Sequence, residues 1–542
     1  MTQKLTIRSI IIGGLLSAII TMSAAYTALR MNAFYWASIL TSLLAIVILK
    51  FVAKLTKSPT NIHEVNLTQT TASTGGILAA GICFTFPALF FLDNNLFQKL
   101  IDSPFSFSLK IFIVTIVGGI LGVILSAHLR KPMILEEKLP FPTGIAAADT
   151  IKNIIEGTKK TLYLFSSFLF AVIFTTLRDG LDSIIKSIIP FFKGITIKGF
   201  NFQFGFIPLT IGGGYLIGFK TSMTWLVGCL ASNWIYQPVL VNLFSIPQDK
   251  LGLNYILPLG VGVVIGSGLF IFIKTILPSI AKTLSDMFDF NSKPGENELS
   301  PRLIPFALLI AIGILTAIFK INILASILAV AGLWLMTVLA SRMAGETNID
   351  PMEILAVIVV IMINIFVRLS HLENIILAGI IAVAVGVAAD LLFDLKAGSI
   401  LGTSPLQLAK AQFIGVFTSS LVVGISLISL VKVYQLGSPE LFAMQAQVVA
   451  FMIGNISWAL FGTGLVIGIL TTLIGFSGLA FGIGFFIPMF FSTGLAIGGL
   501  FKLIVDKRFN DKDEDMRLIS AGLIGGEGVT GSLLAMVKML ML

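Results

Sequence analysis

The sequence predicts an all-α, polytopic membrane protein with about 14 to 17 membrane segments, some of them broken or re-entrant. Only 12% of the 542 residues are charged and 56% are hydrophobic, whereas an ordinary soluble domain carries about 25% charge. Apolar runs long enough to cross a bilayer recur from end to end. No polar stretch is long enough for a separate domain, so we expect a single transmembrane domain over residues 1–542. The longest polar stretches are 178–203, 281–302 and 506–517.

A membrane-spanning helix needs about 20 mainly apolar residues, and this length divides the chain into successive candidate helices. The first apolar run, 10–29, is long enough to span and is followed by no clear small-residue cleavage site. It therefore predicts a first helix and not a signal peptide. The interval 469–504 is long enough for two short passes. The predicted helices lie at 9–29, 34–54, 65–92, 109–129, 160–177, 205–219, 222–244, 254–279, 303–319, 321–340, 352–368, 374–394, 411–432, 443–467, 469–504 and 518–537.

Lysine and arginine gather at the ends of the apolar runs, and the formal net charge is +9. Such clusters set membrane topology beside anionic headgroups, so we expect a lipid bilayer and no nucleic acid as partner. Most clusters fit a cytoplasmic N-terminus in a multi-pass protein of the bacterial cytoplasmic membrane. The loop 178–204 counts against this topology, because its four basic residues would lie outside. Asp179 and Asp182 offset them in part.

No sequence signature of a soluble enzyme stands out in this chain. Cys83 and Cys229 lie inside apolar runs and predict small buried side chains, with no disulfide framework and no metal cluster. Three histidines are too few and too scattered for a histidine metal site. There is no Walker loop and no H-E-x-x-H motif. We therefore expect no enzyme activity, no direct use of ATP, and no resident metal or cofactor.

Two segments, 78–90 and 479–491, predict an internal repeat. Aligned on Pro87 and Pro488 without gaps, LAAGICFTFPALF and LAFGIGFFIPMFF match at seven of thirteen positions, Gly482 included. A Gly-Gly pair and then a basic cluster follow each copy, so the related regions extend over about 61–150 and 460–540. Paired Gly/Pro-interrupted helices are typical of a transporter's central site. We expect helix breaks near that site at Pro87, Pro488, Gly75 and Gly482; close helix packing is the alternative for each glycine. The repeat is either parallel or inverted.

The segment from Glu64 to Gly75 predicts a polar stripe on one helix. Glu64, Thr68, Thr71 and Gly75 recur at helical spacing, so they share a face. That face, with the neighbouring Gln69, is suited to hydrogen-bond a polar solute, and Glu64 could exchange a proton. The alternative is a cytoplasmic helix cap, in which the charge of Glu64 is favourable near the helix N-terminus.

Further ionisable groups lie in later spans, where a charge costs about 2.5–3.5 kcal/mol on insertion scales. Asp390 and Asp394 lie one turn apart, so they repel unless a cation, a proton or Lys396 intervenes. We predict Asp394 and Lys396 as a gate or coupling pair; an interfacial ion pair is the alternative. Glu527, flanked by glycines in the last span, predicts a functional or structural network. Gln445 opens another span and could supply amide contacts.

Six segments in order carry a family resemblance. They are the first span from TIR at 6–8 to AYTALR at 25–30; the Glu64 segment with FPAL at 86–89; LPFPTGIA at 139–146; IGGGYLIG at 211–218; DLKAG at 394–398 with Gly402, Pro405 and Gln412; and GLIGGEG at 522–528. Together they resemble the oligopeptide transporter family, in its prokaryotic and yellow-stripe-like branch. One departure is AMQA at 443–446, where the family often has a proline in second position.

The resemblance implies a secondary active transporter, namely a proton-coupled importer of small oligopeptides or metal–chelate complexes. We expect its solute near the bilayer midplane, between 68–87 and 475–488. The residues predicted to contact solute or proton are Glu64, Thr68, Gln69, Glu527 and Gln445. A solute channel and an intramembrane lipid-modifying enzyme remain as alternatives. The substrate, the stoichiometry and the oligomeric state stay open, with a homodimer as one candidate.

Overall fold

The computed structural model describes residues 5–31, 38–156, 159–180, 195–197, 202–271, 273–274, 298–348, 350–438, 441–454 and 457–541. Most of the predicted polar loops 178–203 and 281–302, with Asp182, lies outside these residues. The described chain is helical apart from one short hairpin and connecting loops. It divides into two compact units: unit 1 comprises 1–158, 279–453 and 535–542, and unit 2 comprises 159–278 and 454–534.

Unit 1 is built from long apolar helices joined by short connections. Its elements are α1 (Ile7–Met31), α2 (Ser38–Thr56), α3 (Ile62–Thr85), α4 (Ala88–Leu92), α5 (Asn94–Ile101), α6 (Pro104–Arg130), the π-helical η1 (Lys131–Glu136), α7 (Pro142–Glu156), α16 (Leu303–Ala317), α17 (Ile323–Thr347), α18 (Met352–Phe366), α19 (His371–Leu401), α20 (Pro405–Val433) and α21 (Met444–Ile453).

The centre of unit 1 is α19, which packs against α3, α6, α17, α18, α7 and α20. Its first turn carries a capping box, in which Ser370 and Glu373 satisfy each other's backbone N–H groups. It ends at Gly402, whose left-handed φ of 72° a residue with a side chain rarely adopts. The most apolar 18-residue window of α19 is completely buried. Asp390 and Asp394 on this helix, which are 1% and 0% exposed, are therefore screened from lipid and from bulk water.

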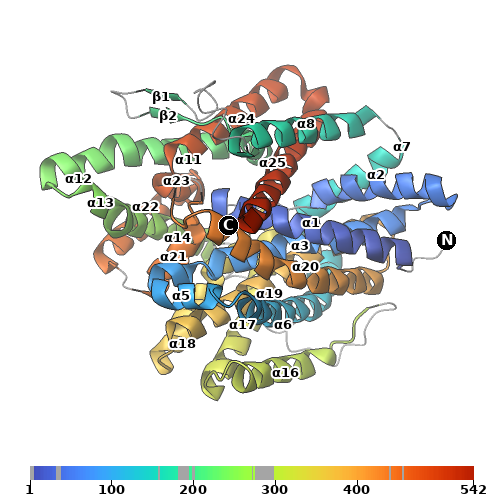
Figure 1. The fold of residues 1–542 in the computed structure, drawn as a ribbon, viewed down its shortest axis with the longest axis horizontal. Helices are drawn as coiled ribbons and strands as arrows, with labels where there is room; N and C mark the ends of the chain where they lie inside the picture. The colour runs from blue at the N-terminus through green and yellow to red at the C-terminus, as the bar shows by residue number, and fades with distance from the viewer. Residues whose placement is uncertain are drawn as a thin grey trace. The chain divides into compact units, whose positions relative to one another are not determined.

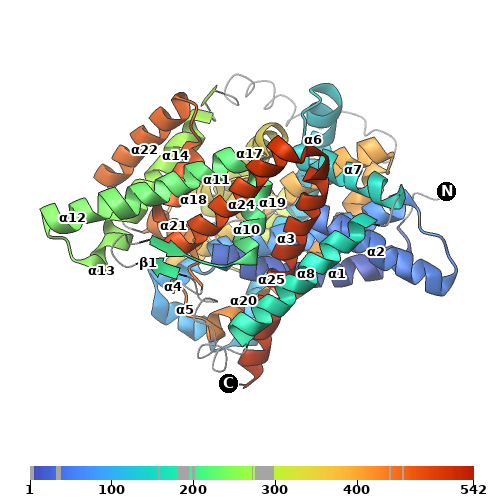
Figure 2. The same ribbon diagram turned by 90° about the horizontal axis from the view of Figure 1, so that it is seen from above.

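The helices α1 and α3 approach each other through small residues, and both figures show them side by side (Figure 1, Figure 2). A Cβ added at Gly75 would collide with the Ser17 carbonyl oxygen. One added at Gly13 would lie 2.7 Å from the Thr71 Cβ. Small residues allow close backbone contact where lipid supplies no hydrophobic drive to helix association. Gly75 therefore allows α3 to pack closely against α1.

Unit 2 contains shorter helices and a hairpin. Its elements are α8 (Lys159–Thr175), η2 (Thr176–Gly180), β1 (Ile195–Ile197), β2 (Phe202–Phe204), α10 (Pro208–Ile217), α11 (Phe219–Leu230), η4 (Ala231–Tyr236), α12 (Gln237–Phe244), α13 (Gln248–Leu251), η5 (Gly252–Ile256), α14 (Leu257–Ile271), α22 (Trp458–Leu473), α23 (Gly478–Phe486), α24 (Met489–Arg508), η8 (Asn510–Lys512) and most of α25 (Asp513–Met541).

Within unit 2, segments distant in sequence pack closely. Figure 2 shows α14 and α22 running side by side, and α14 also contacts α23. The helix α24 packs against both α10 and α11. The strands β1 and β2 pair antiparallel, with Ile195 opposite Phe204. The hairpin is held to α24 by Thr493, whose hydroxyl donates to the Gln203 carbonyl at 3.1 Å.

The polytopic helical fold predicted from composition is confirmed. Nine helices in the described ranges are long and apolar enough to cross a membrane, and four apolar helices of 10–17 residues accompany them. The prediction of one helix over 443–467 is wrong, because α21 ends at Ile453 and α22 begins at Trp458. The interval 469–504 does hold two helices, α23 and α24, after the end of α22. Cys83 and Cys229 are buried and free, as expected.

Two of the four predicted helix breaks occur. Pro87 lies between α3 and α4, and Pro488 lies between α23 and α24. Their backbones differ, because Pro87 is helical with ψ of −14° whereas Pro488 is extended with ψ of 143°. The prediction of breaks at Gly75 and Gly482 is wrong, since both lie inside regular helices whose backbones approach a neighbour closely. The two copies of the predicted repeat fall in different units, and the repeat stays a prediction.

Candidate functional site

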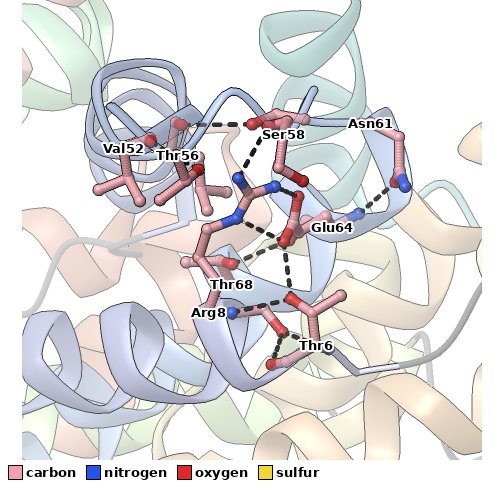
Figure 3. Close-up of polar contacts among 11 residues, drawn as sticks. Thr6, Arg8, Val52, Thr56, Ser58, Asn61, Glu64 and Thr68 are labelled. Atoms are coloured by element: carbon pink, nitrogen blue, oxygen red, sulfur yellow. Dashed lines mark hydrogen bonds and ion pairs between the residues drawn. The ribbon is translucent and has the colours of Figure 1, made fainter. Parts of the chain in front are cut away.

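Glu64 is held in place at the start of α3 in unit 1 (Figure 3). Asn61 caps the helix, its Oδ1 accepting from the Glu64 N–H at 2.8 Å. The carboxylate is 3% exposed and forms an ion pair with Arg8. Thr6 donates to Glu64 Oε1 at 2.6 Å, and Arg8 Nη1 donates to the Ser58 carbonyl at 3.0 Å. The first turn of α1 thereby ties down both ends of the loop that leads into α3.

The predicted stripe on α3 faces α1 among the described residues. The Thr68 hydroxyl donates to the Glu64 carbonyl at 2.8 Å, and the Thr71 hydroxyl donates to the Leu67 carbonyl at 3.0 Å. Gly75 completes this face against Ser17. The hydroxyls are thus satisfied by their own helix, which makes the face suitable for tight packing. A direct role of Thr68 in solute contact stays a prediction.

A second polar face of α3 meets two carboxylates on α19. Gln69 Nε2 donates to Asp394 Oδ1 at 2.8 Å. The Ser73 hydroxyl lies 3.2 Å from Asp390 Oδ2 and 3.3 Å from Asp394 Oδ2. From α20, Gln412 Nε2 donates to Asp390 Oδ2 at 3.0 Å. All five side chains are buried, so unit 1 contains a polar cluster enclosed by apolar helices. We call Gln69, Ser73, Asp390, Asp394 and Gln412 the carboxylate cluster.

The predicted pairing of Asp394 with Lys396 is wrong. Lys396 Nζ donates to the Leu139 carbonyl at 2.9 Å. Asp394 accepts from Gln69 and Ser73. Residues two apart on a helix project about 200° apart, so these two side chains face different neighbours. The role predicted for each of them in gating or coupling stays a prediction, but they do not act as an ion pair in this structure.

Glu527 occupies a buried ion-pair network of unit 2. Arg178 Nη2 donates to Glu527 Oε1 at 2.8 Å, and the Leu209 N–H donates to Glu527 Oε2 at 2.9 Å. Leu209 lies in the first turn of α10, whose helix dipole favours a negative charge there. Arg178 also forms an ion pair with Asp179 at 2.6 Å. The neighbouring Gly526 approaches the Phe168 carbonyl of α8, which lets α25 bring its carboxylate into the interior.

The remaining predicted residues lie in both units. Gln445 is in the first turn of α21, which packs against α3, α4 and α18 in unit 1. The predicted solute region 68–87 lies in unit 1, whereas 475–488 lies in unit 2. A solute site formed by both regions stays a prediction. Within the described ranges, no group of three or more His, Cys, Asp or Glu side chains could hold a metal ion.

Sequence reasoning missed several partners of these carboxylates. Arg8 and Arg178 lie next to apolar runs, where topology-setting or loop charges are expected, yet each pairs with a buried glutamate. Gln412 stands out in the sequence only as part of the family motif, and no sequence pattern singles out Ser73 by itself. One signal was available: Gln69 and Ser73 lie four residues apart, on a different side of α3 from the Glu64 stripe. The partner helix for that second face could not be read from the sequence.

Comparisons with known proteins agree with this architecture. Residues 4–538 match the family model described as OPT oligopeptide transporter protein. A putative oligopeptide transporter of Haemophilus influenzae is 23% identical and aligns over 94% of this chain and 92% of its own length. The metal-nicotianamine transporter YSL1 of Arabidopsis thaliana is 24% identical, with 76% and 70% of the two chains covered. The probable metal-nicotianamine transporter YSL9 of Oryza sativa subsp. japonica is also 24% identical, with 59% and 52% covered.

Proposed function

The chain belongs to the OPT oligopeptide transporter family, and on this premise we propose that it is a proton-coupled importer of small oligopeptides or metal–chelate complexes. The match over nearly the whole chain supports transport as the activity. The names of the relatives support the two substrate classes, because one is a putative oligopeptide transporter and others are metal-nicotianamine transporters. Both classes present amino and carboxylate groups. Such solutes need charged or polar partners inside the membrane.

The observation that carries this proposal is the buried charge inside apolar helices. Glu64 and Glu527 are 3% and 0% exposed, and each is paired with an arginine of its own unit. Ionisable groups at membrane depth are expensive and mark solute pathways and proton relays. We propose Glu64, Thr68, Gln69, Glu527 and Gln445 as groups that bind solute or exchange the coupling proton, with no resident cofactor required.

Uptake into proteoliposomes tests the proposal. With an imposed inward proton gradient, the purified protein should accumulate radiolabelled trialanine or nickel–nicotianamine above the outside concentration. Glu64→Gln and Glu527→Gln should each abolish that accumulation. Exposed Asp149, on α7, provides the matched carboxylate control, and Asp149→Asn should accumulate like the wild type. Full accumulation by both Gln variants would remove these two residues from the mechanism.

A channel is the second candidate function. It would let the probe equilibrate but could not raise its inside concentration above the outside value. Accumulation that collapses when a protonophore is added separates a proton-coupled importer from a channel. Equilibration at the same rate with and without the protonophore would favour the channel.

We also propose a place and an assembly for the protein. The basic clusters at the ends of the apolar runs support the bacterial cytoplasmic membrane with the N-terminus inside. A cysteine introduced beside Arg8 should react with a membrane-impermeant maleimide only after the cells are opened. A homodimer is our proposed assembly, and the mass of the detergent-purified protein tests it.

A further inference from the structure

The carboxylate cluster of unit 1 contains two acids that form no ion pair with any basic side chain the structure describes. Asp390 and Asp394 are 1% and 0% exposed. Neutral side chains of the described residues, among them Gln412, Gln69 and Ser73, donate to them. Two ionised carboxylates one helical turn apart, in an interior of low dielectric constant, repel each other strongly. A positive charge or a proton must therefore accompany the pair.

The contacts of Ser73 favour a proton. Its hydroxyl has one hydrogen to donate, yet its Oγ lies within 3.3 Å of three acceptor oxygens: Asp390 Oδ2, Asp394 Oδ2 and the Thr70 carbonyl. If both aspartates were ionised, at least two of these contacts would bring lone pairs together. If one carboxyl carries a proton, it donates to Ser73 Oγ while Ser73 donates to the other carboxylate. The hydroxyl thereby links the two acids through one shared proton.

The two glutamines give a second and independent indication. The Oε1 atoms of Gln69 and Gln412 are buried and have no hydrogen-bond partner among the described residues. Both side chains are 0% exposed, and both are directed at the aspartates through Nε2. An amide can present its N–H to an ionised carboxylate or, after a half-turn, its oxygen to a protonated carboxyl. Because its Oε1 atom has no other partner, each glutamine can turn its amide to bind the aspartate in either protonation state of the carboxyl group.

Most of the other charged groups on helices packed against α19 are paired or at least partly exposed, and Glu353 is the buried exception. On α3, Glu64 pairs with Arg8, and the His63 ring lies 3.2 Å from the Thr403 hydroxyl. On α18, Glu353 is buried in the first turn. Arg342 of α17 pairs with Glu137 and Glu346, and Arg130 of α6 pairs with Glu298. His128 and Lys110 of α6 are partly buried. Asp149 and Lys152 of α7 and Lys410 of α20 are exposed.

We propose that Asp390 and Asp394 share one exchangeable proton through Ser73, and that this proton is the one whose movement drives import. The inference rests on the proposed proton-coupled function and assigns its coupling site to α19, so that Glu64 and Glu527 act on the solute and not on the coupling proton. Gln69 and Gln412 hold the carboxyl groups in both protonation states. Lys396 takes no part, because its ammonium group is bound to the Leu139 carbonyl.

Asp394→Asn, Asp390→Asn and the double variant test the assignment, because asparagine keeps the shape of a protonated aspartate but cannot exchange its proton. In proteoliposomes with an inward proton gradient, accumulation of radiolabelled trialanine or nickel–nicotianamine should fall at least tenfold in each single variant. Exchange of labelled for unlabelled probe without a gradient should persist, since it needs no net proton movement. Asp149→Asn is the matched control and should behave like the wild type in both assays.

Two results in this assay would overturn the inference: wild-type proton-driven accumulation by the Asn variants, or accumulation in the wild type that follows a sodium gradient and not a proton gradient. The sodium result would identify the cluster as a cation site built from carboxylate and amide oxygens. Ser73→Ala keeps the carboxylates but removes the link, and it should shift the pH profile of accumulation. An unchanged pH profile would contradict the role of Ser73.

An infrared measurement separates this inference from the proposed function. The spectrum of the purified wild type minus that of the double variant should show the C=O stretch of a buried protonated carboxyl near neutral pH, because other buried acids such as Asp350 cancel in this difference. If the wild type accumulates neither probe but the band is present and lost on mutation, the proposed function fails while the shared proton stands. If the band is absent from this difference spectrum, the shared proton is excluded whatever the transport assays show.

Discussion

At the scale of single residues, the protein stabilises buried charge through partners that come from distant parts of the chain. Arg8 and Glu64 are separated by 56 residues, and Arg178 and Glu527 by 349. Each glutamate accepts at least two hydrogen bonds, so neither carboxylate is left as an isolated charge in apolar surroundings. Removal of one partner leaves the other as an uncompensated buried charge, and this lowers the stability of the folded protein.

Glu64→Gln should therefore destabilise the protein by about 3 kcal/mol, because the Arg8 guanidinium loses its counter-charge. The double variant Arg8→Gln/Glu64→Gln should be more stable than the Glu64 single variant, since it leaves no unpaired charge. Thermal unfolding of the detergent-purified proteins measures both effects. Equal stability of the single and double variants would show that the pair itself does not hold α1 to α3.

Asp350, between α17 and α18, predicts a pH dependence of stability. Both of its carboxylate oxygens are buried and lack a hydrogen-bond partner among the described residues. Burial, and then repulsion from Glu353, raises its pKa from 3.8 to about 8. The folded state therefore binds this proton more tightly than the unfolded state. The stability it contributes is fully present below about pH 4 and is lost as the pH rises through about 8.

Asp350→Asn should flatten this dependence, because asparagine has no proton to lose. Melting temperatures of the wild type and the variant, measured from pH 5 to about pH 9, provide the comparison. The wild type should lose more stability than the variant over the upper part of this range. A parallel decline of the two curves would place the titration on another group.

At the scale of elements, glycine decides which helices come into close contact. The seam between α1 and α3 depends on Gly13 and Gly75, whereas Gly313 on α16 has nothing within 4 Å of an added Cβ. All three are helical glycines of unit 1. A helical glycine is costly in itself, so its presence in a tight seam reflects packing. Gly313 is the control position, because it is a helical glycine with no close neighbour among the described residues.

Gly75→Ala should destabilise the protein by about 1–3 kcal/mol, because the new methyl group meets the Ser17 backbone, which cannot rotate away. Gly313→Ala should be neutral or stabilising by up to about 1 kcal/mol, since it adds helix propensity in open space. The two melting temperatures measured side by side test this difference. Similar shifts for both variants would mean that α1 can move aside at little cost.

At the scale of the whole molecule, each compact unit has its own apolar helices and its own buried charged groups. Unit 1 contains the Arg8–Glu64 pair and the carboxylate cluster, and unit 2 contains the Arg178–Glu527 network. A transported solute must bind to the folded protein before it moves. Binding to the folded state alone raises the apparent stability of the whole chain.

A substrate present at about 100 times its dissociation constant should therefore stabilise the protein by about 2.7 kcal/mol. A thermal-shift screen with di- to pentapeptides, glutathione and metal–nicotianamine complexes measures this effect. Free nicotianamine and free metal serve as controls for the chelate. Stabilisation by the metal alone would indicate metal binding in place of chelate recognition.

The sequence by itself determined the fold class, the approximate position of most helices and the list of expensive groups. Composition and the length of apolar runs suffice for this, because a bilayer admits few structures other than helices and each span has a nearly fixed length. Glu64, Asp394, Gln69 and Glu527 could be selected because a charge or amide inside an apolar run is conspicuous.

Only the tertiary structure decided which of these groups meet. It joined Glu64 to Arg8 and Glu527 to Arg178, directed Lys396 to a carbonyl, and placed Ser73 between Asp390 and Asp394. It also showed Gly75 as a packing residue. The physical reason is that helical periodicity tells which side chains share a face, whereas the partner of that face is chosen by packing among helices far apart in sequence.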